Sequence, residues 1–309
     1  MYCALQIVPD GGIMKGQAFE KEGDYSMNVR TIKAADITQA VKAVFMDLNY
    51  HIGSDILNAL QTAQQQETSP IAQNVLAQLL ENHRIASEEE VPICQDTGMA
   101  VLFVEYGEQV VIGDGHFEEA IQEGVRQAYQ EGYLRKSVVD DPVFDRVNTK
   151  DNTPALIYTD IVPGDKIRIL AGCKGFGSEN MSAIKMLTPS AGLEGVKQFI
   201  MDTVRYAGPN PCPPIVVGVG IGGTFEKAAM MAKKATLRPI NTRHADERYA
   251  ALEDELLTMI NATGYGPAGL GGQTTALGVN IETAPTHIAG MPVAVNICCH
   301  AARHKTIEI

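Results

Sequence analysis

Apolar residues recur at helical spacing through the first regular part of the chain. Asp36 is of a residue type that favours helix N-caps, and the apolar positions after it are Ile37, Val41, Val44, Phe45, Leu48 and Ile52. A second helix is predicted around Ile56, Leu57 and Leu60, and a third from Pro70 to the acidic residues 87–90. We therefore expect the chain to begin its folded part with a layer of helices.

Beyond residue 98 the pattern changes to short runs rich in β-branched residues. They predict strands at 99–107, 155–162, 165–172, 214–220 and 292–298. Helical spacing separates these runs at about 117–132, 191–206, 225–235 and 246–262. The pattern predicts a mixed α/β (α+β) fold, in which an N-terminal helical layer is followed by a mixed β-sheet flanked by helices. No repeat or linker follows Met27, so residues 27–309 are expected to form one compact domain.

Residues 1–26 show no comparable period and contain a Gly11-Gly12 pair. They predict a disordered leader, or residues that precede a true start at Met27. The layout of a signal peptide, basic and then apolar, is missing from this segment, and no apolar run approaches the roughly 18–20 residues that span a bilayer. We therefore expect a cytoplasmic protein without a membrane partner.

Charge and cysteine content narrow the classes of function. With 25 basic and 37 acidic residues the formal charge is −12, which disfavours a broad binding surface for nucleic acid or anionic lipid. Six cysteines in 309 residues are too few for a disulfide scaffold, and in a reducing compartment they would remain thiols. They are thus free for metal binding or catalysis.

Three of these cysteines share a local context. Cys94, Cys212 and Cys299 each lie beside a turn or a strand end, in "PICQDTG", "NPCPP" and "ICCHAARH". Their separations match no short zinc or ferredoxin spacing, so the fold itself would have to assemble a metal site. Three thiolates on one centre suit a [4Fe–4S] cluster with one open iron, whereas buried apolar packing is the alternative for each cysteine.

Other motifs support weaker hypotheses. Gly218, Gly220 and Gly223 satisfy G-x-G-x-x-G, but no acid follows at the expected distance, so we expect a tight turn between strand and helix rather than NAD binding. A second glycine-containing turn, 175–177, precedes a predicted helix. The glycine-rich stretch 264–292 is interpreted as a loop, in which His287 is either functional or structural.

The C-terminal histidines His300 and His304 lie close in sequence to Cys298 and Cys299. They either imitate a zinc site or face solvent on a turn.

Taken together, the motifs resemble one known group. "CQDTG", "LRKSVVDDPVFDRVNTKDNTPA", "GCKGFGSEN", "NPCPPIVVGVGIGGTFEKAAMMAKKA", "GYGPAGLGG", "PTHIAG" and "VNICCHAARH" occur in this order between Met27 and the end. This series is similar to the N-terminal, alpha part of the class I fumarases and the L-tartrate dehydratase alpha subunits.

The resemblance implies a [4Fe–4S] hydro-lyase with the cysteine ligands Cys94, Cys212 and Cys299, and no ligand role for Cys3 or Cys173. It implies that Asp96 is catalytic. The substrate, a small dicarboxylate, would be bound by Gln95, Arg135, Gly177 and His287. Relatives usually have glycine where this chain has Phe176, which puts the backbone contact of Gly177 in question.

Single-chain members of the group carry a second domain after the third cysteine motif. The resemblance therefore implies a separate beta subunit, which completes the site and acts on C3 of the substrate in a hetero-oligomer. Fumarate hydratase, interconverting (S)-malate and fumarate, is the expected activity. The alternatives are an L(+)-tartrate dehydratase alpha subunit and a non-catalytic metal-binding scaffold or sensor.

Overall fold

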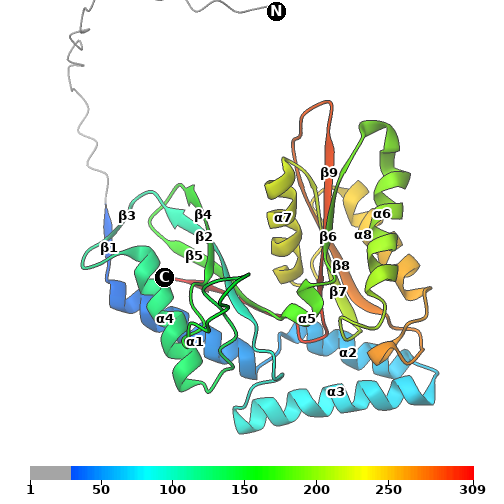
Figure 1. Ribbon diagram of the computed structural model, residues 1–309, viewed down its shortest axis with the longest axis horizontal. Coiled ribbons are helices and arrows are strands. Elements are labelled where there is room, and N and C mark those ends of the chain that lie inside the picture. Colours follow the sequence, from blue (N-terminus) through cyan, green and yellow to red (C-terminus); the bar gives the residue numbers. More distant parts are fainter. Residues whose placement is uncertain (1–28) are drawn as a thin grey trace, which may run out of the picture.

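The computed structural model describes residues 29–309 (Figure 1), so the predicted leader at 1–26 lies outside the described residues. The helices are α1 (Ala34–Tyr50), α2 (Ser54–Gln66), α3 (Pro70–Glu89), α4 (Phe117–Glu131), α5 (Phe176–Glu179), α6 (Gly192–Ala207), α7 (Phe225–Leu237) and α8 (Glu247–Asn261), with short 3₁₀ turns η1 (Pro189–Ala191) and η2 (Pro267–Gly269). The strands are β1 (Arg30–Ile32), β2 (Met99–Gly107), β3 (Val110–Ile112), β4 (Leu156–Val162), β5 (Ile167–Lys174), β6 (Ala183–Leu187), β7 (Ile215–Gly222), β8 (Ala276–Ala284), β9 (Met291–Cys298) and β10 (Arg303–Glu308).

The first four-stranded sheet has the order β10-β5-β2-β4. Strand β2 pairs parallel with β4 and antiparallel with β5, and β10 pairs antiparallel with β5. Successive side chains of a strand point to opposite faces, so β2 contributes to two cores. Leu102 and Val104 pack with α1 and α4, whereas Val101 and Phe103 pack on the other face against Leu237 of α7. This sheet is therefore covered on both faces.

The second four-stranded sheet has the order β6-β9-β7-β8, and helices α6 and α8 pack on one face of it. Helix α7 packs on the other face, where β7 presents Gly218 and Gly220 instead of side chains. A Cβ on Gly220 would lie 2.1 Å from the carbonyl oxygen of Ala228, and one on Gly218 would lie 2.2 Å from that of Ala232. These glycines let the helix approach the sheet closely, which is a structural reason for the glycine motif.

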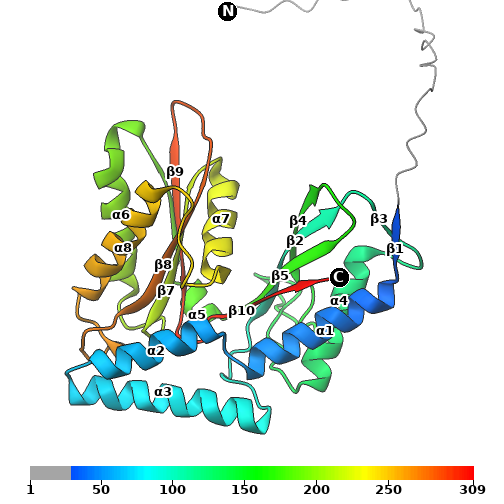
Figure 2. The ribbon, with the colours of Figure 1, turned by 180° about the vertical axis from the view of Figure 1, so that it is seen from behind.

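Helix α7 lies between the two sheets, because its residues contact β2 in one core cluster and β9 in another. The layers run from α1 and α4 through the first sheet, α7 and the second sheet to α6 and α8 (Figures 1 and 2). Helices α2 and α3 run along one edge of the molecule and pack on the start of β7. One compact domain results, with β1 and β3 as a small parallel pair at its side.

The mixed α/β class and the N-terminal helical layer are confirmed, although the strands form two four-stranded sheets rather than one. Helix α5 is only four residues long, and the helix expected after it is wrong, since 183–187 is strand β6. Pairing with β9 fixes this segment as an edge strand. The loop expected at 264–292 contains strand β8, which pairs parallel with β7.

Candidate active site

The segment between α3 and β2 holds Cys94, Gln95 and Asp96 in a tight turn. The backbone N–H of Asp96 donates to the Cys94 thiol at 3.4 Å. One carboxylate oxygen of Asp96 accepts from the N–H of Gly98 at 3.0 Å, and the other accepts from the N–H of Phe176 at 2.8 Å. Gln95 is exposed beside them. The turn therefore aims its thiol and its acid in orientations fixed by the backbone, and it ties the α3–β2 loop to α5.

Cys212 lies in the loop between α6 and β7 and has an unusual backbone. Its φ of 56° is in the left-handed region, which costs a residue with a Cβ about 1–2 kcal/mol. Its N–H donates to the carbonyl of Pro209 at 3.2 Å, and its side chain is exposed. Such strain is typical of positions where the surrounding fold fixes a functional side chain.

The three cysteines named from the sequence lie close together in the fold. Burial and the nearby thiols of Cys299 and Cys94 raise the pKa of Cys212. Among residues 29–309, however, no three His, Cys, Asp or Glu side chains are close enough to hold a single metal ion.

The adjacent cysteines of the β9–β10 connection differ in position. Cys298 ends β9 and is 2% exposed in the core between α2, α3 and β7, whereas Cys299 is partly buried. The two neighbouring thiols interact, and this interaction lowers the pKa of Cys298 to about 6 and raises that of Cys299. Only Cys299 of the two acts appreciably on Cys212. Position therefore favours Cys299 as the third member of the thiol group.

A buried ion cluster holds the α5 turn beside Asp96. Lys174, which is 1% exposed, pairs with Glu179 at 3.1 Å and donates to the Ser178 hydroxyl at 3.0 Å. Glu179 also pairs with Lys233 of α7 and accepts from Asn296 of β9 at 3.0 Å. Although burial opposes it, the two lysines lower the pKa of Glu179 to about 2. These buried ion pairs thus fix the α5 turn, which carries Phe176 and Gly177.

Gly177, in the α5 turn, and Arg135, beside the Cys94–Asp96 turn, are both exposed. No atom lies within 4 Å of where a Cβ of Gly177 would be. The carbonyl oxygen of Arg135 accepts from the hydroxyl of Thr97 at 3.0 Å, which places the Arg135 backbone next to the Cys94–Asp96 turn. No carboxylate in the described part of the chain forms an ion pair with its guanidinium, so that group is available to a ligand.

His287 is not brought to this group. Its loop is held to the far end of β7, where the hydroxyl of Thr286 donates to the carbonyl of Gly223 at 2.9 Å. Cys212 precedes β7, and Cys298 pairs with Val216 at the start of that strand. The strand has eight residues, so at a rise of about 3.3 Å per residue its first and last residues are roughly 23 Å apart. His287 is exposed there and lines a groove between α7 and β4.

A polar network behind the Cys94–Asp96 turn was not foreseen from the sequence. Arg303, only 2% exposed, donates to the side-chain oxygen of Asn49 and to the carbonyl of Asp96, both at 2.9 Å. The Asn49 amide donates to the Cys173 thiol at 3.3 Å. The hydroxyl of Tyr129 lies 2.8 Å from the carbonyl of Gly98. Burial raises the pKa of both Cys173 and Tyr129, so these two groups stay protonated.

The C-terminal histidines form no zinc site with Cys298 and Cys299, and they do not face solvent. His304 pairs with Asp55 at 3.3 Å, and both side chains are 6% exposed. His300 packs edge-on against the buried His83, with ring centroids 6.0 Å apart. Both histidines thus have structural contacts, His300 just before β10 and His304 within it.

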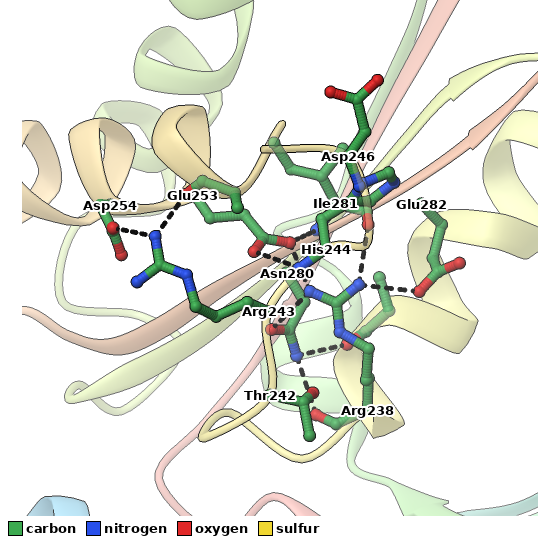
Figure 3. Close-up of polar contacts among 12 residues, drawn as sticks. Arg238, Thr242, Arg243, His244, Asp246, Glu253, Asp254, Asn280, Ile281 and Glu282 are labelled. Atoms are coloured by element: carbon green, nitrogen blue, oxygen red, sulfur yellow. Dashed lines mark hydrogen bonds and ion pairs between the residues drawn. The ribbon is translucent and has the colours of Figure 1, made fainter. Parts of the chain in front are cut away.

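A partly buried arginine shows how the fold balances such a charge elsewhere. Arg238, at the end of α7, pairs with the carboxylates of Glu253 and Glu282 and donates to the oxygens of Asn280 and Ile281 (Figure 3). Glu253 also accepts from the N–H of Ile281 at 2.8 Å. This network ties α7 and α8 to β8 and contains none of the thiols.

Known proteins similar to this chain share nearly its full length. Residues 38–308 match the family model described as fumarate hydratase (Fumerase). A putative L(+)-tartrate dehydratase subunit alpha from Methanocaldococcus jannaschii is 45% identical over 277 residues, 88% of this chain and 97% of the relative. The L(+)-tartrate dehydratase subunit alpha of Escherichia coli UTI89 is 34% identical, over 88% of this chain and 90% of its own length. Within the described residues no helix is long and apolar enough to cross a membrane.

Proposed function

The chain belongs to the fumarate hydratase (Fumerase) family, and from this premise we propose that it is the alpha subunit of a [4Fe–4S] hydro-lyase for a small 2-hydroxy dicarboxylate. The observation that carries the proposal is the meeting of Cys94, Cys212 and Cys299, from three separate loops, beside the fixed carboxylate of Asp96. A partner subunit that completes the site agrees with the names of the relatives, which are alpha subunits.

The donor set fits a cluster in two respects. Three thiols suit iron, and the left-handed backbone of Cys212 shows that one of them is held at a defined angle. The fully buried guanidinium of Arg303 also places a positive charge behind the thiols, where an anionic group would be stabilised. When bound, the cluster would supply a Lewis-acidic iron for the substrate hydroxyl, with Cys94, Cys212 and Cys299 as its protein ligands.

Asp96 is the proposed proton-transfer group for the hydroxyl that leaves as water. Dehydration breaks the C2–O bond and removes a proton from C3, so one group must deliver a proton to the leaving oxygen. The N–H groups of Gly98 and Phe176 fix the Asp96 carboxylate through one bond to each oxygen. A carboxyl held in this way needs little reorganisation to transfer the proton. The group that acts on C3 is assigned to the partner subunit.

Substrate carboxylates would be bound by the free guanidinium of Arg135, whose planar fork matches a carboxylate better than a lysine does. Gln95 and the exposed backbone at Gly177 line the same side of the Cys94–Asp96 turn and are the further proposed contacts. Phe176 does not disturb the turn, because its N–H reaches Asp96 and its ring is 45% exposed. His287 is left out of this chain's own site, since its loop lies at the other end of β7.

The proposed substrate pair is (S)-malate and fumarate. L(+)-tartrate is the second candidate, favoured by the names of the relatives. Asp96, Arg135 and the thiols would contact the hydroxyl and carboxylates that these acids share, so assays with the substrates must decide. The chain should be co-expressed anaerobically with its candidate beta subunit, reconstituted with iron and sulfide, and assayed for fumarate from malate and for oxaloacetate from tartrate. A bound cluster without turnover of either acid would favour the scaffold or sensor alternative.

Replacing Asp96 by Asn tests the proton-transfer role. We expect kcat to fall by about 10²–10⁴-fold with iron content unchanged, because the amide keeps the shape of the carboxyl but carries no transferable proton. Asp160→Asn, which changes an exposed acid on β4, serves as the control and should retain wild-type turnover. Undiminished turnover in Asp96→Asn would show that another group transfers the proton.

A further inference from the structure

Arg303 is a buried cation without a carboxylate partner. Its guanidinium donates to two neutral oxygens, those of Asn49 and the Asp96 backbone, and its Nε has no partner among the described residues. The side chain of Asp96, whose carbonyl Arg303 contacts, forms no ion pair with the guanidinium. Its two carboxylate oxygens accept hydrogen bonds from the N–H groups of Gly98 and Phe176. The residue is 2% exposed, so water does not balance its charge either.

A comparison with Arg238, a partly buried arginine, makes this absence informative. The side chain of Arg238 is 18% exposed, more than that of Arg303, yet it is balanced by the two carboxylates of Glu253 and Glu282 (Figure 3). A buried charge without a counter-charge costs several kcal/mol, even after relaxation of the protein. We therefore expect an anion to balance the charge of the Arg303 guanidinium in the working protein.

Several thiols and one phenol lie around Arg303. The nearby thiols of Cys173, Cys299 and Cys94, together with Tyr129, raise the pKa of Arg303 against the effect of burial. Cys173 and Tyr129 stay protonated, because burial raises the pKa of each. The guanidinium instead contacts the carbonyl of Asp96, whose own N–H donates to the Cys94 thiol, so its charge lies beside the turn that carries a proposed cluster ligand.

We propose that Arg303 is the positioning residue of the cluster: it braces the Cys94–Asp96 turn through the Asp96 carbonyl and supplies the fixed positive charge that balances the cluster with its thiolates. This inference rests on the proposed function. The two bonds of the guanidinium also connect α1, through Asn49, with the turn and with β10, so the charge cannot move away when the site is empty.

The test separates charge from shape with two variants of the full-length chain, co-expressed with the candidate beta subunit and purified anaerobically. Arg303→Gln removes the charge, and Arg303→Lys keeps the charge but cannot make both bonds. The readouts are iron and sulfide per chain, the midpoint potential of the cluster, and the rate of iron release to a chelator.

For Arg303→Gln we expect a several-fold lower cluster content and a more negative potential, because a nearby positive charge stabilises the reduced cluster. For Arg303→Lys we expect an unchanged potential with iron release several-fold faster than in the wild type.

Arg238→Gln is the control, since it removes a partly buried arginine whose ion pairs include none of the thiols. It should lower thermal stability but leave the potential of the bound cluster unchanged. Wild-type content and potential in Arg303→Gln would overturn the inference. If Arg303→Gln does not fold, Arg303→Lys decides, because a shifted potential in that variant, which keeps the charge, would contradict a role for the charge. A wild-type chain that takes up no cluster would overturn the proposed function, and this inference with it.

Discussion

His83 is a buried titratable residue that lies near the candidate site without taking part in it. His83 is 4% exposed, and neither of its ring nitrogens has a hydrogen-bond partner within the described part of the chain. Burial alone lowers its pKa to about 4. Its ring packs against His300, which follows a proposed cluster ligand, but it offers no polar contact to the site. We therefore interpret His83 as a neutral packing residue.

The pH dependence of stability should report this burial. The pKa of His83 falls from 6.5 to about 4 on folding, so between these values the unfolded chain binds a proton that the folded chain excludes. Stability from this residue is complete above pH 6.5 and is lost as the pH falls toward 4, by about 2 kcal/mol at pH 5. His83→Leu should remove that part of the decline, as measured by urea unfolding at pH 7 and pH 5. The exposed His116→Gln is the control, and an equal decline in all three proteins would contradict the prediction.

Sequence reasoning at this scale reached some residues and missed others for physical reasons. Cys94 and Asp96 stood out because a thiol and an acid share one turn. The approach of Cys212 and Cys299 to that turn depends on tertiary structure and could not be derived from spacing, so it was expected only from the resemblance. Arg303 gave no signal, since nothing in "AARH" distinguishes a buried arginine from an exposed one. The separation of His287 from the cysteines likewise required the sheet topology.

At the scale of elements, the pattern of apolar residues correctly predicted segments with many buried apolar side chains of their own. The strand 99–107 agrees with β2 at both ends, because alternate side chains enter two different cores. Strand β8 was hidden in a glycine-rich stretch, and β10 carries too many polar residues to stand out. Both lie at sheet edges and pair with one neighbour only; β8 is largely buried, whereas in β10 pairing with β5 rather than burial decides the conformation.

The contact between β7 and α7 allows a direct test of close packing. Gly220→Ala would place a Cβ 2.1 Å from the Ala228 oxygen and 2.7 Å from the Ala232 nitrogen, both of which are backbone atoms. We expect a loss of about 3 kcal/mol in unfolding free energy, because the helix would have to move away from the sheet. Gly177→Ala is the matched control, since no atom lies within 4 Å of its Cβ position, and its stability should change by less than about 0.5 kcal/mol. Similar denaturation midpoints for Gly220→Ala and the wild type would refute this view of the glycine motif.

At the scale of the whole molecule, the candidate site lies where the two sheets are joined. Cys94 leads into the first sheet through β2, Cys212 leads into the second through β7, and Cys299 lies on the connection from β9 to β10. A cluster bound to all three would therefore link the two sheets directly. The site is thus also expected to contribute to the stability of the fold.

Removing iron should consequently weaken the whole fold. For the reconstituted protein we expect chelation to lower Tm by about 5 °C or more, measured anaerobically by calorimetry. Cys212→Ser, which lacks one proposed ligand, is the control, and its Tm should not respond to the chelator. An equal response of both proteins would mean that the chelator acts elsewhere, and no response of the loaded wild type would contradict the link between the sheets.

The last two strands have a consequence for how the chain is made. β9 lies between β6 and β7 in the second sheet, and β10 completes the edge of the first. Because ribosomes release residues in order, neither sheet can close until residues 291–308 have emerged. Until then β6 has no partner and one side of β5 is bare, and such unpaired edges favour association between nascent chains. The thiol group can therefore assemble only late in synthesis, since Cys299 emerges within the segment that completes both sheets.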